Sequence, residues 1–192
     1  MASAAVIPRI TPRQYLALER KADFKSEYHD GFIIAMAGTS REHSLIAGNL
    51  HGDIWSQLKK RPCEVHVNDL RVRVSPTGLY TYPDVVAVCG EAEFEDDEVD
   101  TLLNPTMIAE VLSPSTESYD RGDKFAHYRQ LSSLREYVLI AQDKVLVEHY
   151  TRQGNDWLLT ELRGLDDTLQ LASIQCEVSL REIYAKVKFP AD

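Results

Sequence analysis

The chain has 192 residues, of which 44% are hydrophobic and 27% charged, and its formal net charge is −9. This size and composition predict a single globular domain over residues 1–192, with a core from about 11 to 184. No apolar run approaches the roughly 20 residues that span a bilayer, and the acidic balance argues against binding nucleic acid through non-specific phosphate contacts alone.

The first half of the chain predicts two helices separated by a hairpin. Residues 1–8 lack basic residues and a long apolar stretch, so we expect no signal peptide. Thr11-Pro12 is typical of a helix start. The turn His29-Asp30-Gly31 predicts a hairpin of strands 25–28 and 32–37. Capping-box spacing at 39–42 predicts a helix to about residue 60, with His43 on its apolar face.

The second half predicts mostly strands. Asp120 is expected to cap a helix that carries Phe125, Tyr128 and Leu131, and a short helix is expected near 179–184. The alternating apolar patterns predict strands over residues 63–67, 70–74, 84–88, 107–112, 136–141, 145–150, 157–163 and 168–171. Together these elements predict an α/β or α+β fold.

The three cysteines, Cys63, Cys89 and Cys176, are widely spaced and odd in number. They match neither a zinc pattern nor a disulfide framework, so we expect free structural cysteines in a reducing cytoplasm. The chain also lacks a glycine-rich phosphate loop and a Gly-x-Ser-x-Gly elbow, which argues against nucleotide-binding and serine-hydrolase machinery.

The most informative residues are Asp84 and Glu110, each inside an apolar strand pattern. A carboxylate in a buried strand is costly unless it is compensated, and two that meet either bind a cation or share a proton. If the two strands are neighbours, oxygen ligands of this kind suit Mg²⁺ or Mn²⁺. The alternative is that each acid is satisfied separately. If the two acids do meet, Asp84→Ala relieves their repulsion, so we expect it to leave the metal-free fold intact or more stable.

Pro83-Asp84 followed by Glu110-Val-Leu resembles the PD-(D/E)XK, or restriction-endonuclease-like, nuclease superfamily. The longer string Glu110-Val-Leu-Ser-Pro-Ser-Thr-Glu117, then 119–124, Tyr128 and Glu136-Tyr137, is similar to its Uma-two branch of endonuclease-like proteins. The likeness covers roughly residues 11–183.

That resemblance implies a central mixed β-sheet flanked by helices. It also implies metal ligands at Asp84, Glu110 and Glu27, with the backbone carbonyl of Val111 as a further ligand. It brings His43 into the site as a group that orients water or donates to phosphate. Taken alone, Glu27 would be a solvated side chain and His43 a hydrogen-bonded core histidine.

This sequence departs from the superfamily at one position. Leu112 stands where the superfamily has a lysine two places after the glutamate, and that ammonium normally helps to stabilise the charge of the transition state. We expect Lys124 to be its substitute, reaching back from the next helix. The alternative is an exposed helix lysine.

The sequence therefore predicts a cytoplasmic, Mg²⁺- or Mn²⁺-dependent endonuclease acting on DNA, with no membrane partner and with a homodimer as one option. The expected catalytic residues are Asp84, Glu110, Lys124, Glu27 and His43. Two alternatives stay open: an interaction domain that has lost activity with the motif lysine, and a metal-dependent hydrolase of a small phosphoester.

Overall fold

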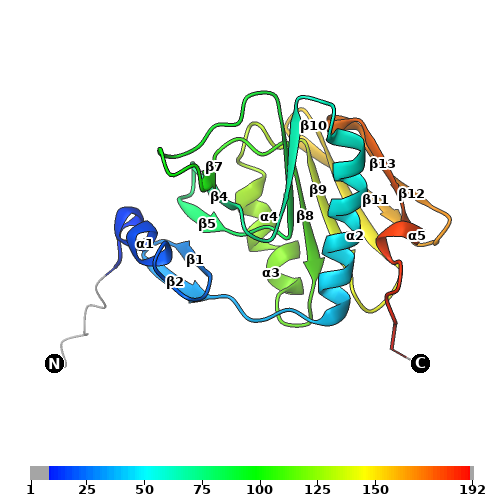
Figure 1. Ribbon diagram of the computed structural model, residues 1–192, viewed down its shortest axis with the longest axis horizontal. Coiled ribbons are helices and arrows are strands. Elements are labelled where there is room, and N and C mark those ends of the chain that lie inside the picture. The colour runs from blue at the N-terminus through cyan, green and yellow to red at the C-terminus, as the bar shows by residue number, and fades with distance from the viewer. Residues whose placement is uncertain (1–8, 191–192) are drawn as a thin grey trace.

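The structure, a computed structural model, describes residues 9–190. Residues 1–8, for which we expected no signal peptide, lie outside the described residues. Two mixed sheets, a short hairpin and a few helices make up a mixed α+β fold, as the sequence predicts (Figure 1). Between residues 9 and 190, no helix is both long enough and apolar enough to cross a membrane.

The central sheet has six strands in the order β11-β10-β9-β8-β6-β3. Only β8 and β9 run parallel to each other, and the other neighbours are antiparallel. Both β8 and β9 are buried along their whole length. The strands are β3 (Cys63–Val67), β6 (Val85–Cys89), β8 (Met107–Leu112), β9 (Glu136–Ala141), β10 (Val147–Gln153) and β11 (Asp156–Leu162).

A second sheet of five short strands has the order β2-β1-β5-β4-β7. Its first hairpin turns at Asp30-Gly31, where both residues have positive φ (47° and 90°), the backbone of a type I′ turn. The predicted hairpin is therefore confirmed. The strands are β1 (Ser26–His29), β2 (Phe32–Ala35), β4 (Arg71–Val74), β5 (Leu79–Thr81) and β7 (Thr101–Leu102).

In the described part of the chain, five helices complete the fold with one 3₁₀ turn and a two-stranded hairpin. Figure 1 shows α2 along one side of the central sheet and α3 between β8 and the β1–β2 hairpin. The elements are α1 (Pro12–Glu19), α2 (Arg41–Leu58), α3 (Glu117–Arg121), α4 (Asp123–Tyr128), β12 (Thr168–Leu171), η1 (Ala172–Ile174), β13 (Cys176–Ser179) and α5 (Leu180–Ile183).

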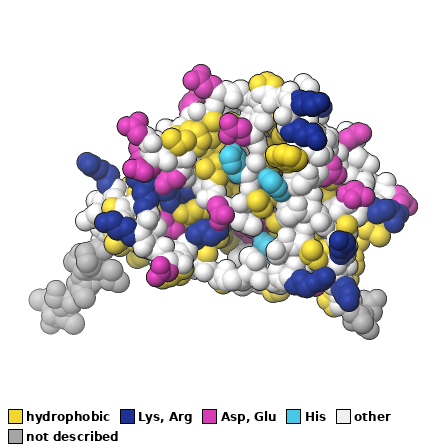
Figure 2. Space-filling model, in the orientation of Figure 1, with side chains coloured by type: hydrophobic (Ala, Val, Ile, Leu, Met, Phe, Trp, Pro, Cys, Tyr) yellow, Lys and Arg dark blue, Asp and Glu magenta, His cyan; other side chains and the backbone are white. Residues whose placement is uncertain are grey.

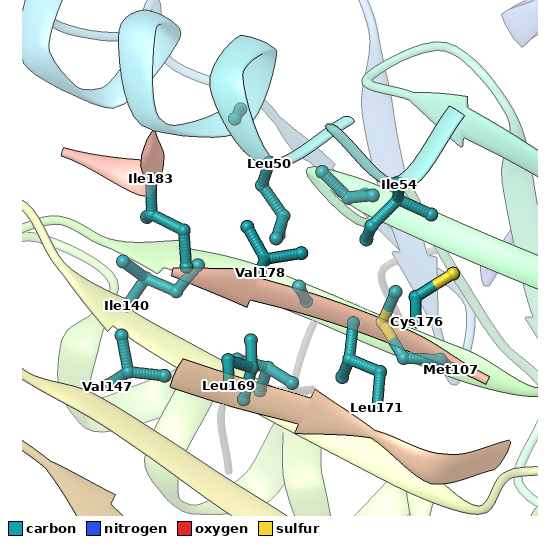
Figure 3. Packing of buried hydrophobic residues seen from close by; sticks show 14 of the residues in the cluster. Leu50, Ile54, Met107, Ile140, Val147, Leu169, Leu171, Cys176, Val178 and Ile183 are labelled. Atoms are coloured by element: carbon teal, nitrogen blue, oxygen red, sulfur yellow. The ribbon is translucent and has the colours of Figure 1, made fainter. Parts of the chain in front are cut away.

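The two faces of the central sheet pack into two different cores. On one face, α2 packs through the predicted stripe that includes Leu50 and Ile54, against β12 and β13 (Figure 3). On the other face, β8 packs through Ile108 and Leu112 against α4 and the second sheet. Because strand side chains alternate, Glu110 projects toward α4, on the same face as Leu112.

Several local expectations need correction. Ser40 caps α2, accepting the backbone N–H of His43. Asp120 does not cap a helix: it lies buried inside α3, and Gly122 separates α3 from α4, which ends before Leu131. Strands β5, β7 and β13 were not expected, because two to four residues are too few for a clear period-2 pattern.

The expectation of three free cysteines is also wrong. Cys63 and Cys89 form a disulfide, because the antiparallel pairing of β3 and β6 places them directly opposite each other. Only a tertiary contact between distant strands brings them together, so their spacing in the sequence carries no signal. Cys176 is free and buried. The cysteines therefore no longer argue for a reducing compartment.

The segment over residues 91–100, which carries seven acidic residues, is largely exposed. Arg20 ties it to α1 through ion pairs with Asp96 and Asp100, each 2.8 Å long. Figure 2 shows that acidic and basic side chains are interspersed on the visible face, with acids gathered near the end that Figure 1 labels β4 and β7.

Candidate active site

Asp84 and Glu110 lie side by side, as the sequence predicts for neighbouring strands. β6 and β8 are antiparallel neighbours with Val85 opposite Ala109, so Asp84, one residue before β6, lies beside Glu110. The Asp84 N–H donates to Glu110 Oε2 at 3.3 Å, and the Val111 N–H donates to Asp84 Oδ2 at 2.7 Å. The two acids and the Val111 backbone therefore form one cluster.

Lys124 reaches this cluster from α4. Its Nζ lies 2.9 Å from Glu110 Oε1, 3.3 Å from Glu27 Oε1 and 3.4 Å from Asp120 Oδ1. The side chain is buried, so the alternative of an exposed helix lysine is wrong. Packing of α4 on the face of β8 that carries Glu110 explains how an ammonium from the next helix arrives there.

Glu27 enters the cluster from the far side, on β1. It is buried, and Thr81 Oγ1 on β5 donates to its Oε1. The alternative of a solvated side chain is therefore wrong. The five-stranded sheet supplies this carboxylate, whereas the central sheet supplies Asp84 and Glu110, so the cluster joins the two sheets.

His43 lies on the buried face of α2 and contacts the cluster through Asp84. Its Nε2 lies 2.8 Å from Asp84 Oδ1. The Asp84 carboxylate thus bridges the His43 ring and the Val111 N–H. His43 is both a hydrogen-bonded core residue and a neighbour of the cluster, so the structural role and the site role that the sequence left open are compatible.

Burial dominates the electrostatics of the cluster. Desolvation raises the pKa of the Glu110 carboxyl to about 8, although the Lys124 ammonium opposes the shift. Burial also raises the pKa of Asp120. Desolvation lowers the pKa of Lys124, but the surrounding Glu110, Tyr128, Glu27 and Asp120 outweigh it and raise that pKa well above its usual value. The ammonium therefore stays charged among the acids.

Three residues of the cluster were missed or underestimated. Asp120 was expected to cap a helix, yet its carboxylate faces Lys124. The spacing of four residues between them was the available signal. Tyr128 was interpreted as core packing, but its hydroxyl also donates to Glu110 Oε1 at 2.9 Å. Thr81 lies on a strand that the sequence pattern did not reveal.

Within residues 9–190, no group of three or more His, Cys, Asp and Glu side chains is arranged to hold a metal ion. The contacts above give the reason: Lys124 occupies the point on which Glu27, Glu110 and Asp120 converge, while Asp84 is engaged by His43 and Val111.

Comparison with known proteins identifies the family. The model of the Uma2 family, described as "Putative restriction endonuclease", matches residues 12–182. The chain belongs to the Uma2 family. The resemblance noted from the sequence is thereby confirmed, and the matched range includes every residue of the cluster.

Two uncharacterised proteins of Synechocystis sp. (strain PCC 6803) are relatives of this Uma2 protein. One is 40% identical over 81% of this chain and 88% of its own length, and the other is 35% identical over 97% of both chains. A crystal structure from Anabaena variabilis, named as a putative nuclease belonging to DUF820, matches with a TM-score of 0.73. It is 21% identical and covers 92% of this chain and 98% of its own. This likeness shows that the two chains share one fold.

Proposed function

We propose that this Uma2 protein is a metal-dependent endonuclease that hydrolyses phosphodiester bonds in DNA. The observation that carries the proposal is the convergence of Glu110, Glu27 and Asp120, from three separate segments, around one buried ammonium, with Asp84 hydrogen-bonded beside Glu110. Buried carboxylates are costly, and a fold that gathers three of them around one ammonium is built to hold positive charge at that point. The nuclease family supports the reading.

The types of donor atom suit a hard divalent cation, although their present arrangement is occupied by the Lys124 ammonium. The groups that meet are carboxylate oxygens, and the backbone of Val111 lies beside them. Carboxylate and backbone carbonyl oxygens are ligands that Mg²⁺ and Mn²⁺ prefer. We expect Asp84, Glu110, the Val111 carbonyl and Glu27 to hold the ion. When bound, such an ion supplies a Lewis acid and lowers the pKa of coordinated water.

The residues of the chain have separate tasks in this proposal. His43 is fixed by its contact with Asp84 and can orient a water molecule or donate to a phosphate oxygen. Lys124 keeps a full positive charge near Glu110 and can offset the negative charge that develops on phosphorus. Tyr128 and Thr81 donate to Glu110 and Glu27 and hold these carboxylates in place.

Lys124 compensates for the leucine at the motif position. Leu112 is buried in the core between the central sheet and α4. It lies on the same face of β8 as Glu110, so a lysine at this position would direct its ammonium toward that carboxylate. Lys124 brings an ammonium to Glu110 from α4 instead. The departure from the motif therefore need not remove activity.

Nucleic acid is the substrate that the family suggests, and we infer that it is DNA. The test is cleavage of plasmid and of single-stranded DNA during titration with Mg²⁺ or Mn²⁺. Asp84→Asn and Glu110→Gln, which keep size while removing charge, should abolish cleavage. Asp69→Asn is the matched control, because Asp69 is exposed and pairs only with Lys25.

Binding of Mn²⁺ is measured separately by calorimetry. Uptake that depends on Asp84 and Glu110, without cleavage of any nucleic acid, would point to a small phosphoester as substrate. No uptake and no cleavage would leave an interaction domain, in which Lys124 alone balances the acids, and would refute the proposal.

A further inference from the structure

The strand β2 forms one edge of its sheet and carries no charged side chain that would hinder pairing with another strand. It lies at one end of the five-stranded sheet, and all four of its side chains are exposed. Phe32, Ile33 and Ile34 are 48%, 37% and 57% exposed, and Met36 just beyond the strand is also exposed. A run of exposed apolar residues on a sheet edge is a template for another strand.

The other edges of the two large sheets are protected. β7 has only two residues and is buried. β3 carries Glu64 and His66 and packs beside α2. β11 carries acids near both ends, at Asp156 and Glu161. Short length, charge and cover are the devices that keep edges from pairing. With four residues β2 is short, and Arg9 lies over its Phe32 ring at 5.8 Å. However, no side chain of the strand is charged, and its outward edge pairs with no strand among the described residues.

The register of the β1–β2 hairpin determines which backbone groups of β2 are free. Met36 N–H donates to Lys25 O at 2.9 Å, and Ile34 lies opposite Glu27. Because backbone groups alternate along a strand, Phe32, Ile34 and Met36 direct theirs toward β1. Ile33 and Ala35 direct theirs outward, where no described residue forms a ladder with them.

We propose that β2 pairs antiparallel with β2 of a second copy of this chain, with the two-fold axis at Ile34. This register places Ile33 opposite Ala35 of the second copy, so the outward backbone groups of both strands bond each other. It also places Ile34 against Ile34 and Phe32 against Met36, which are all apolar pairs.

Charge favours a second copy as the occupant. The chain has a net charge of −9, so two copies repel unless they meet where no carboxylate intervenes. Residues 32–36 carry no charge, and at the adjacent turn Asp30 is paired with Arg9 at 2.9 Å. Self-pairing at the acid-bearing β11 would instead bring like charges together.

Charge complementation tests the register. Sedimentation velocity over a wide range of protein concentrations should show a monomer–dimer equilibrium for the wild type. Ile34→Lys and Ile34→Glu should each weaken the dimer at least about a hundredfold, because each removes two buried isoleucines and places like charges opposite each other. An equimolar mixture of the two variants should form a heterodimer, because position 34 faces its own copy.

Leu158→Lys is the matched control, since Leu158 is a 51% exposed residue on the edge strand β11. It should leave the dimer unchanged. Circular dichroism and thermal unfolding verify that each variant is folded. A wild type that stays monomeric at every concentration, a dimer that survives Ile34→Lys, or variants that do not complement each other would overturn the proposal.

Discussion

Lys124 Nζ lies 2.9 Å from Glu110 Oε1, with both side chains buried. The contact joins α4 to β8 and so connects the two parts of the sequence on which the nuclease resemblance depends. It also gathers Glu27 and Asp120 around the same ammonium. In the metal-free protein, this single charge balances the cluster.

Replacing Lys124 with methionine should destabilise the metal-free protein by about 3 kcal/mol, because the substitution leaves several buried carboxylates without a compensating charge. Divalent cations should restore part of the loss. The measurement is thermal unfolding in chelator and in Mn²⁺. Lys144→Met, at an exposed turn, is the control. Equal stability of Lys124→Met and wild type in chelator would mean that the acids are mostly protonated.

Glu110 should make stability depend on pH. Its carboxyl pKa is about 8 in the folded protein and ordinarily 4.5. Between these two pH values the folded state therefore keeps a proton that the unfolded state has released. The free energy of unfolding therefore falls as pH rises through the window, by up to about 1.4 kcal/mol per pH unit from this group.

Glu110→Gln isolates this contribution, because glutamine resembles the protonated acid. Urea unfolding of both proteins at a series of pH values gives the difference in unfolding free energy. Stability of the wild type relative to the variant should decline between about pH 4.5 and pH 8. A difference that does not change with pH would show that Glu110 keeps an ordinary pKa.

Asp84→Ala should destabilise the metal-free protein by about 1–3 kcal/mol. Repulsion between acids led us to expect an intact or more stable fold. In the structure, however, the Asp84 carboxylate contacts His43 Nε2 and accepts from the Val111 N–H, and alanine leaves both without this partner. Thermal unfolding in chelator decides between these two expectations. Asp84→Asn should lose less stability than Asp84→Ala. A higher melting temperature for Asp84→Ala would support the repulsion argument.

The disulfide between Cys63 and Cys89 should stabilise the oxidised protein by about 3 kcal/mol, since it closes a loop between residues 26 apart in the sequence. Urea unfolding with and without a thiol reductant measures the contribution. The double variant Cys63→Ala/Cys89→Ala should be insensitive to the reductant. If mass spectrometry under non-reducing conditions finds all three thiols free, the pairing does not form in solution.

The sequence by itself determined α1, α2, α5 and most strands of this fold, because their periods are local. The stripe of α2, the hairpin at Asp30-Gly31 and the runs around Asp84 and Glu110 can each be recognised within a few turns or a few residues. The site residues themselves depended on the family resemblance, since a lone Glu27 or Lys124 has no local signature of function.

Only the tertiary structure decided which of these residues meet. The packing of α4 on β8 turned Lys124 and Asp120 inward, and the pairing of β3 with β6 joined two cysteines that the sequence leaves far apart. Such contacts depend on how distant segments pack, and the free energy of packing belongs to pairs of surfaces, which no local pattern encodes.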